Sequence, residues 1–365
     1  MRPRHTAAEA AMGLLHRAAT YLNTASPASE RDLGRIMQAA LPEPVGHPGY
    51  RDKRFLLQPH FSETAGDSLS FMLDTGGPGA TGSDRLETTT RAMSDVVGNH
   101  FGGEALNWFR GRSEPLNQES RRAVSWGALF DTKLDRGGVT EAAAMYELGP
   151  GLMDSLPSPL FRVARVAMES LPGLRPAFST IRCGRSSGSQ QLTFEVEHAL
   201  PLSNLQPLMQ NLGLGHQHAS LMSACALVLG ARFTLPPNTA TVTLRPSRAG
   251  IELRLDVLLD ALPDVPSQMV SLLRLQMGER PRSLRALTRW LTALTPEGYP
   301  GPGNLSVLSV WVRPDVPARV ALYLRPAALE PDGQPMPRHA PAPPEHRPAP
   351  VVAASREDWA LWSPT

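Results

Sequence analysis

Aliphatic and polar residues alternate in several stretches of this chain, most clearly in residues 318–326, ARVALYLRP. One side of that stretch is aliphatic and consists of Val320, Leu322 and Leu324. Arg319 and Tyr323 lie on the other side. A period of two residues is typical of a β-strand that buries one face. The fold must therefore accommodate polar strand faces that lack the usual lysine and glutamate mixture of a solvated surface.

The same alternation predicts further strands throughout the chain. They cover residues 67–74, 123–131, 140–148, 177–185, 190–197, 239–245, 251–258 and 305–313. Stretches with the helical spacing of apolar residues precede or separate these strands. They are residues 6–23, 29–40, 85–101, 160–171, 203–229, 267–278 and 282–294. From residue 159 onward, a unit of helix, strand, strand and helix recurs at intervals of roughly sixty residues, longer than a solenoid repeat.

If the aliphatic side of each strand faces the helices, the opposite sides form a polar set. It comprises Thr180, Arg182, Gln191, Thr193, Glu195, Thr241, Thr243, Arg245, Glu252, Arg254, Asp256, Ser309, Trp311, Arg313, Arg319 and Tyr323. Such a set lies either in water, on an open sheet, or inside a closed barrel. Trp311 and Tyr323 favour closure, because aromatic residues among polar ones are typical of a binding chamber. We therefore predict an α+β fold, an antiparallel β-barrel of about ten strands surrounded by helices in repeated αββα units.

The composition argues against several classes of protein. No apolar run of about 18 residues is present, which argues against a membrane span. His16 and Arg17 interrupt the N-terminal apolar patch, which argues against a signal peptide. The two cysteines, Cys183 and Cys225, fit a reducing cytoplasm. We therefore expect a cytoplasmic protein that does not bind membranes. Because the net charge of +2 is spread along the chain, we expect no nucleic-acid partner either.

The predicted elements divide the chain into three regions. Residues 1–49 form N-terminal helices and an approach loop, residues 50–326 form the barrel, and residues 327–365 form a proline-rich tail. The prolines of the tail favour an extended, unpacked segment. Trp359 and Trp362 near its end are candidates for docking on the domain or on a partner. Association through this tail and an open polar sheet face is therefore one alternative function.

Two motifs have both a functional and a structural interpretation. The glycine-rich stretch TGGPGATGSD suggests a phosphate-binding loop, but it has neither the Lys-Ser/Thr of a Walker loop nor the spacing of a dinucleotide fingerprint. A connection that ends at a helix N-cap, with Ser83 and Asp84, is favoured instead. His216 and His218 suggest a metal pair, but no carboxylate or cysteine occurs at ligand spacing nearby. We therefore expect a loop there and no metal site.

The repeated helix, strand, strand, helix units and the strand motifs ARVALYL, AAAMYELGP, QQLTF and IELRLDV resemble the aromatic prenyltransferases. That family includes the dimethylallyltryptophan synthase type and the peptide-modifying prenyltransferases of bacterial secondary metabolism. The resemblance covers residues from about 50 to 326. It implies transfer of a dimethylallyl-type prenyl group from its diphosphate to an aromatic small molecule or peptide side chain inside the barrel. The resemblance does not define a cofactor, although Mg²⁺ bound together with the diphosphate is compatible with it.

The resemblance also implies roles for the polar residues. Cationic side chains would bind the diphosphate, since guanidinium groups bind phosphate oxygens bidentately. Aromatic faces would shield the allyl cation. The implied substrate-binding residues are Arg182, Arg245, Arg254, Trp311, Arg313, Arg319 and Tyr323. Asp74, Glu195 and Glu252 are the candidates for the catalytic base, with Asp256 as a further carboxylate on the same face as Glu252.

The chain departs from the family pattern at several places. Ala321, Ala143 and Met145 occupy places where Lys or Tyr is usual, Gln191 occupies a common Arg place, and Ser70 occupies the place of the catalytic glutamate of tryptophan-prenylating members. Each lost charge-assisted contact would weaken diphosphate binding by about 1.5 to 3 kcal/mol. The alternative to a transferase is therefore a degenerate barrel that binds a ligand or a pathway partner without chemistry.

Overall fold

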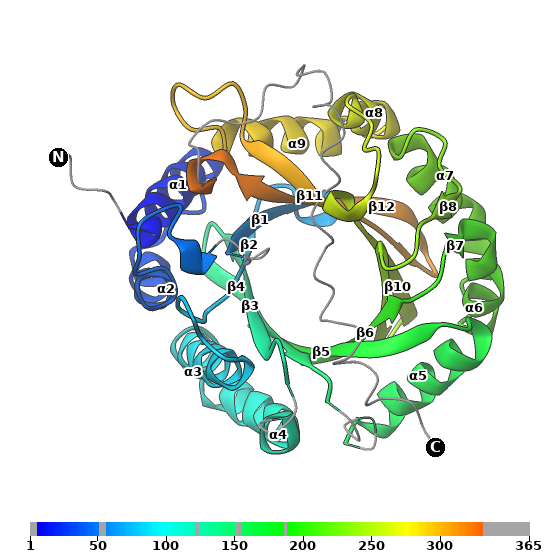
Figure 1. Ribbon diagram of the computed structural model, residues 1–365, viewed down its shortest axis with the longest axis horizontal. Helices are drawn as coiled ribbons and strands as arrows, with labels where there is room; N and C mark the ends of the chain where they lie inside the picture. Colours follow the sequence, from blue (N-terminus) through cyan, green and yellow to red (C-terminus); the bar gives the residue numbers. More distant parts are fainter. Residues whose placement is uncertain are drawn as a thin grey trace. The chain divides into compact units, whose positions relative to one another are not determined.

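The computed structural model describes residues 6–50, 56–120, 124–149, 153, 155–185 and 188–330, except for the side chains of residues 118–120. Within these ranges, antiparallel strands close into a barrel in the order β1-β12-β11-β10-β9-β6-β5-β4-β3-β2 (Figure 1). The predicted α+β barrel is confirmed, and the open sheet is excluded. The proline-rich tail lies outside the described residues from residue 331 onward.

The strands of the barrel form hairpins that follow one another in the sequence. Their bounds are β1 Leu57–Ser62, β2 Leu69–Leu73, β3 Ala128–Asp135, β4 Gly138–Glu147, β5 Leu174–Gly184, β6 Gly188–Val196, β9 Ala240–Ser247, β10 Gly250–Leu258, β11 Gly303–Arg313 and β12 Val316–Pro326. A separate two-stranded ribbon pairs β7 Leu200–Pro201 with β8 Thr234–Leu235. Because consecutive barrel strands are antiparallel, all the short hairpin turns lie at one end of the barrel.

Helices cover the outside of the barrel (Figure 1). They are α1 Ala7–Leu22, α2 Pro27–Ala40, α3 Gly82–Phe101, α4 Gly103–Ser120, α5 Ser158–Ser170, α6 Leu205–Asn211, α7 His218–Val228, α8 Met269–Gln276 and α9 Pro281–Ala293. Short 3-10 turns are η1 Pro48–Tyr50, η2 Glu63–Ala65, η3 Leu202–Asn204, η4 Gly215–Gln217, η5 Leu259–Ala261 and η6 Ala327–Leu329. In the described part of the chain, no helix has the length and apolar character needed to cross a bilayer.

The hydrophobic core lies between the barrel and the helices. Val320, Leu322 and Leu324 of β12 are fully buried, and they belong to one cluster with helix residues such as Leu14 of α1 and Leu221 of α7. Burial of this aliphatic face drives the strands against the helices. Because the barrel is closed, the alternate residues of each strand face its lumen.

The predictions of the first strand and of one helix N-cap were wrong in detail. The predicted first strand, 67–74, is shorter and is the second strand, because β1 precedes it. β1 was not predicted because it contains Pro59, and a proline usually argues against a strand. Helix α3 has its N-cap at Thr81 instead of Ser83, because Asp84 sits at the third helical position and completes a capping box with Thr81.

Two helical regions also differ from the prediction. The predicted helix 203–229 is divided into α6 and α7, with η4 between them. Helix α4 was not predicted, and it contains Pro115 in its interior. Its hydrophobic periodicity is weak because charged and polar residues occur around most of its circumference.

The close approach of α3 to β3 makes a prediction about stability. Gly127 has φ +89°, and a Cβ there would lie 2.0 Å from the carbonyl oxygen of Gly82. We expect Gly127→Ala to lower the free energy of unfolding by more than about 2 kcal/mol. Gly111→Ala in the exposed part of α4, where an added Cβ meets nothing within 4 Å, should slightly stabilise the helix. Equal thermal midpoints for the two variants would contradict this prediction.

Candidate active site in the barrel lumen

The strand register gathers the polar faces inside the barrel. Arg254 of β10 lies opposite Trp311 of β11, which lies opposite Arg319 of β12. Directly opposite residues of antiparallel strands point to the same face. Their sequence neighbours Leu253 and Val312 are fully buried in the outer core. Arg254, Trp311 and Arg319 therefore line the lumen together.

Arg182 forms the centre of one ionic cluster. It is paired with Glu141 of β4, and its Nη2 lies 3.4 Å from Asp131 Oδ2 of β3. Burial raises the pKa of Glu141, but the charges of Arg182 and Lys133 outweigh it, so the net shift is downward. The carboxylate therefore stays ionised, and Arg182 is held charged between two anions.

Arg254 and Asp256 form a second ionic cluster on β10. Nη2 of Arg254 lies 2.9 Å from Asp256 Oδ2, and its Nε donates to the same oxygen at 3.0 Å. Asp256 also accepts hydrogen bonds from Ser309 and, at 3.4 Å, from Thr241. The Asp256 side chain is 9% exposed, so this carboxylate is stabilised by three neighbours in a site nearly free of water.

Arg245 and Arg313 share one carboxylate near the hairpin end of the barrel. Glu252 Oε2 lies 2.7 Å from Arg245 Nη2 and 2.9 Å from Arg313 Nε. Arg319 differs from these arginines, because its Nη1 donates only to the backbone oxygens of Pro317 and Ala318, at 3.4 and 3.3 Å. Among the described residues, no carboxylate forms an ion pair with Arg319. Its guanidinium can therefore meet an anionic ligand without first leaving a carboxylate.

Aromatic side chains lie among these charges. The guanidinium carbon of Arg313 is 4.6 Å from the centroid of the Trp311 ring. The ring centroids of Tyr323 and His60 are 4.8 Å apart, with an interplanar angle of 33°. Burial raises the pKa of Tyr323 to about 12, although Arg254 opposes the shift. The phenol therefore stays neutral, and its ring offers an electron-rich face to the lumen.

A cavity of about 910 Å³ opens at the hairpin end. Its charged lining consists of Glu141, Arg182, Arg245 and Arg248. The remaining lining comes mainly from backbone-rich turns of the β5–β6 and β9–β10 hairpins, including Gly184 and Gly188. A volume of this size accommodates a small organic substrate, and its three arginines favour an anionic group.

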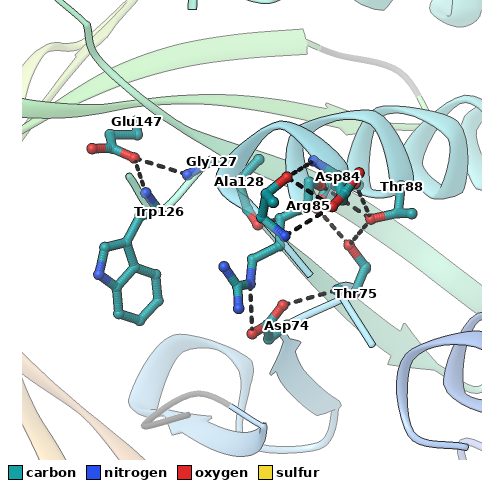
Figure 2. Close-up of polar contacts among 12 residues, drawn as sticks. Asp74, Thr75, Asp84, Arg85, Thr88, Trp126, Gly127, Ala128 and Glu147 are labelled. Carbon is teal, nitrogen blue, oxygen red and sulfur yellow. Dashed lines mark hydrogen bonds and ion pairs between the residues drawn. The ribbon is translucent and has the colours of Figure 1, made fainter. Parts of the chain in front are cut away.

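Two of the candidate catalytic carboxylates lie apart from this arrangement. Asp74 follows β2, where its Oδ2 accepts from Arg85 Nε at 3.1 Å and its Oδ1 accepts from the Gly76 N–H at 2.9 Å (Figure 2). Glu195 is paired with Arg175, opposite it on β5, and burial raises its pKa. Arg175 lies near the start of β5 and Arg182 near its end, so the structure does not bring Glu195 to the Arg182 cluster.

Figure 2 also shows Glu147, whose role is in local folding. Its carboxylate accepts the backbone N–H of Gly127 at 2.8 Å and that of Trp126, and it accepts the Ser125 hydroxyl at 3.0 Å. These bonds fix the segment that leads into β3. A carboxylate engaged by three donors is a structural anchor, because most of its acceptor sites are already occupied.

Several lumen residues were missed by sequence analysis. They are His60, Asp131, Lys133 and Glu141. His60 was missed because β1 was not predicted. A signal for Glu141 was present, since it lies two positions from Ala143, which occupies a place where the resembling family has a polar residue. Ser70 lies on the second strand, directly opposite His60, so only its placement on the first strand was wrong.

The two histidines of GHQH make hydrogen bonds to main-chain carbonyls. His216 Nε2 lies 2.7 Å from the oxygen of Pro314, and His218 Nε2 lies 3.0 Å from the oxygen of Leu202. Their two rings thus reach different segments. Within the described ranges, no three His, Cys, Asp or Glu side chains gather into a metal site.

Comparison with known proteins identifies solved structures of the same fold. PriB, a prenyltransferase solved with product diphosphate, is 16% identical, with a TM-score of 0.67 over 88% of this chain and 97% of that chain. The 5-dimethylallyltryptophan synthase from Streptomyces coelicolor is 15% identical, with a TM-score of 0.66 over 89% and 99% of the two chains. The 6-dimethylallyltryptophan synthase from Micromonospora olivasterospora, in complex with DMASPP and Trp, is 12% identical, with a TM-score of 0.68 over 90% and 99%.

These likenesses show the fold. They confirm the αββα barrel fold that the sequence motifs suggested, at a level of identity that fits a divergent chain. Neither a protein-family profile nor a curated protein sequence matches the chain.

Proposed function

We propose that this protein transfers a dimethylallyl-type prenyl group from its diphosphate to an aromatic small molecule or an aromatic side chain of a peptide. The observation that carries the proposal is the convergence of arginines from β5, β9, β10, β11 and β12 on a closed lumen that also contains Trp311 and Tyr323. Proteins of the same fold have been solved with diphosphate or with DMASPP and Trp. The combination of cationic and aromatic groups suits a substrate that is anionic at one end and becomes a carbocation at the other.

The reaction follows from these groups in three steps. Arginines bind the diphosphate and stabilise the charge that it gains when the allylic C–O bond breaks. The faces of Tyr323 and Trp311 stabilise the resulting allyl cation and exclude water. A ring carbon of the acceptor forms the new C–C bond and then loses its proton, which leaves prenylated acceptor, diphosphate and one proton.

Ala143 explains how one missing cation is replaced. In the register, Ala143 of β4 lies between Asp131 of β3 and Arg182 of β5. Its small side chain lets the Arg182 guanidinium reach across β4 to Asp131. A lysine at this place would compete for the same carboxylates, so Arg182 takes over the cationic role.

Mg²⁺ enters the proposal only together with the diphosphate. The lumen carboxylates Asp131, Glu141, Glu252 and Asp256 are paired with arginines or with His60. They are therefore unsuited to a cage of oxygen ligands for the ion.

The buried, unpaired cysteines Cys183 and Cys225 support a reducing cytoplasm. We place the reaction there, as part of bacterial secondary metabolism and without nucleic-acid or membrane partners.

The direct test is incubation with dimethylallyl diphosphate and a panel of tryptophan, tyrosine, indole and cyclic peptides, with and without Mg²⁺. We expect a mass gain of one prenyl group on at least one acceptor. Calorimetry with dimethylallyl thiolodiphosphate measures donor binding separately. No mass gain and no donor binding would refute the transferase.

The alternative function is a barrel that binds a ligand or pathway partner without chemistry. It is favoured by the neutralisation of the lumen arginines by carboxylates, and by Ala321 and Ala143 in the places of lysines. Donor binding without turnover would support this function. Arg319→Ala separates the two, because a transferase loses turnover and a binding barrel has none to lose.

Glu252 gives a prediction about donor affinity. It neutralises both Arg245 and Arg313, so it competes with a diphosphate for these two cations. We expect Glu252→Gln to tighten binding of dimethylallyl thiolodiphosphate by roughly threefold to tenfold, on the order of 1 kcal/mol, with turnover retained. If turnover were lost while donor binding stayed unchanged, Glu252 would be the catalytic base that the sequence analysis considered.

A further inference from the structure

His60 occupies a central place in the lumen. On one side it lies opposite Tyr323 of β12, and on the other it lies opposite Ser70 of β2. Its side chain is 13% exposed. The Tyr323 ring is tilted against it at 4.8 Å between centroids. His60 is thus beside the aromatic group that is proposed to face the allyl cation.

Neither ring nitrogen of His60 is engaged in a hydrogen bond within the described part of the chain. Nε2 lies 3.7 Å from Asp131 Oδ1, which is longer than a hydrogen bond. Nδ1 is buried and has no hydrogen-bond partner among the described residues. The imidazole is therefore a basic group held in place by packing, with a carboxylate close by that could stabilise a positive charge.

The other candidate proton acceptors in the lumen are already engaged. Glu141 and Asp131 are paired with Arg182, Glu252 with two arginines, and Asp256 with Arg254 and two hydroxyl groups. A carboxylate in such pairs is a weak base, because the neighbouring cations stabilise its ionised form. Among the titratable groups named here, His60 alone combines a lumen position with nitrogens free of hydrogen bonds.

We propose that His60 Nε2 accepts the proton that the acceptor ring carbon loses after the new C–C bond has formed. The ring C–H bond breaks, its electron pair restores aromaticity, and the proton passes to Nε2. Asp131 then stabilises the imidazolium until the proton leaves with the solvent. This assignment rests on the proposed transferase function and names the residue that completes it.

The surroundings of His60 fit this role. Burial is the largest influence and lowers the pKa of His60 below its ordinary value of 6.5. Asp131 of β3 and Glu141 of β4 oppose that shift, and Arg182 of β5 and Arg254 of β10 add to it. Tyr323 stays neutral. Lys133 of β3 lies opposite Ser70, on the same face as His60 and with β2 between them. The imidazole is therefore neutral at pH 7, and activity should fall only as the pH drops below about 6.5.

The test compares the wild-type protein with His60→Gln. We expect kcat to fall by about a hundredfold, while the Kd for dimethylallyl thiolodiphosphate changes less than threefold. We also expect the acidic limb of the wild-type pH profile to disappear. With an acceptor deuterated at the carbon that is prenylated, the variant should show a larger primary isotope effect, because proton loss has become slow. A purely structural role would not move the isotope effect.

His216→Gln is the matched control, since His216 lies outside the barrel and contacts the Pro314 carbonyl. It should behave as the wild type in every assay. A wild-type profile without an acidic limb would overturn the assignment even if His60→Gln failed to fold. Normal kcat and isotope effect in His60→Gln would overturn it while leaving the transferase intact. Absence of prenyl transfer by the wild type with all acceptors would overturn the proposed function and this assignment together.

Discussion

Replacing Arg254 by glutamine should weaken binding of dimethylallyl thiolodiphosphate on the order of tenfold to a hundredfold. The loss of one charge-assisted contact corresponds to about 1.5 to 3 kcal/mol. Arg254 of β10 lines the lumen opposite Trp311, and its charge opposes the upward pKa shift of the neutral Tyr323 phenol. Calorimetric titration of wild type and variant with the thiolodiphosphate measures the effect without dependence on any acceptor.

Arg254 is expected to have a large effect because its existing ion pair is easily exchanged. When a diphosphate binds the guanidinium, Asp256 keeps its hydrogen bonds from Ser309 and Thr241. The carboxylate is therefore not left without partners, which would cost much of the binding energy. Arg182 is different, since it serves both Glu141 and Asp131, and its removal would take the paired arginine from two partly buried anions.

The double variant Arg254→Gln with Asp256→Asn distinguishes lost donor contact from a disturbed lumen. If the effect came from an unpaired Asp256, the second substitution would restore binding. Arg289→Gln is the control outside the barrel, because Arg289 of α9 pairs with the exposed Asp67. An unchanged Kd in Arg254→Gln, with normal folding, would remove Arg254 from the donor site.

Much of the fold could be predicted because the strand signal is local. In β10 and β12, aliphatic residues occupy every second position, and burial of one face requires this pattern. β1 carries the same alternation, with Gln58, His60 and Ser62 facing one way. It escaped prediction because Pro59 lies within it. Proline is tolerated there, where the chain pairs with Phe71 of β2.

The face of each lumen residue could be predicted, but its partner could not. Alternation alone places Arg182 and Arg254 on polar faces. Which carboxylate each one meets depends on the register between strands and on barrel closure, which are set by contacts far apart in sequence. The approach of His60 to Asp131 is an example, because β2 lies between their strands. The pairing of strands therefore decides which arginines are neutralised by carboxylates, and this pairing cannot be deduced from composition.

Removal of the Glu63 carboxylate should destabilise the barrel where it closes. Only three residue pairs join β1 to β12 in the register. Glu63 extends this contact, because its Oε2 accepts the N–H of Val320 at 2.8 Å. Its Oε1 lies 3.0 Å from Arg280 Nε, and its side chain is fully buried. We expect Glu63→Ala to lower the free energy of unfolding by about 3 kcal/mol, measured by urea denaturation.

Loosening the β1–β12 pairing should also disturb the proposed active site. His60 and Tyr323 are themselves one of the three pairs, so loosening it moves the proposed base and the aromatic shield together. Glu63→Gln, which keeps an acceptor for Val320, should lose about half as much stability. Asp67→Ala is the control, because Asp67 is 87% exposed in its pair with Arg289, and it should change stability by less than about 0.5 kcal/mol. Equal stability of Glu63→Ala and Asp67→Ala would mean that the β1–β12 pairing holds the lumen closed without Glu63.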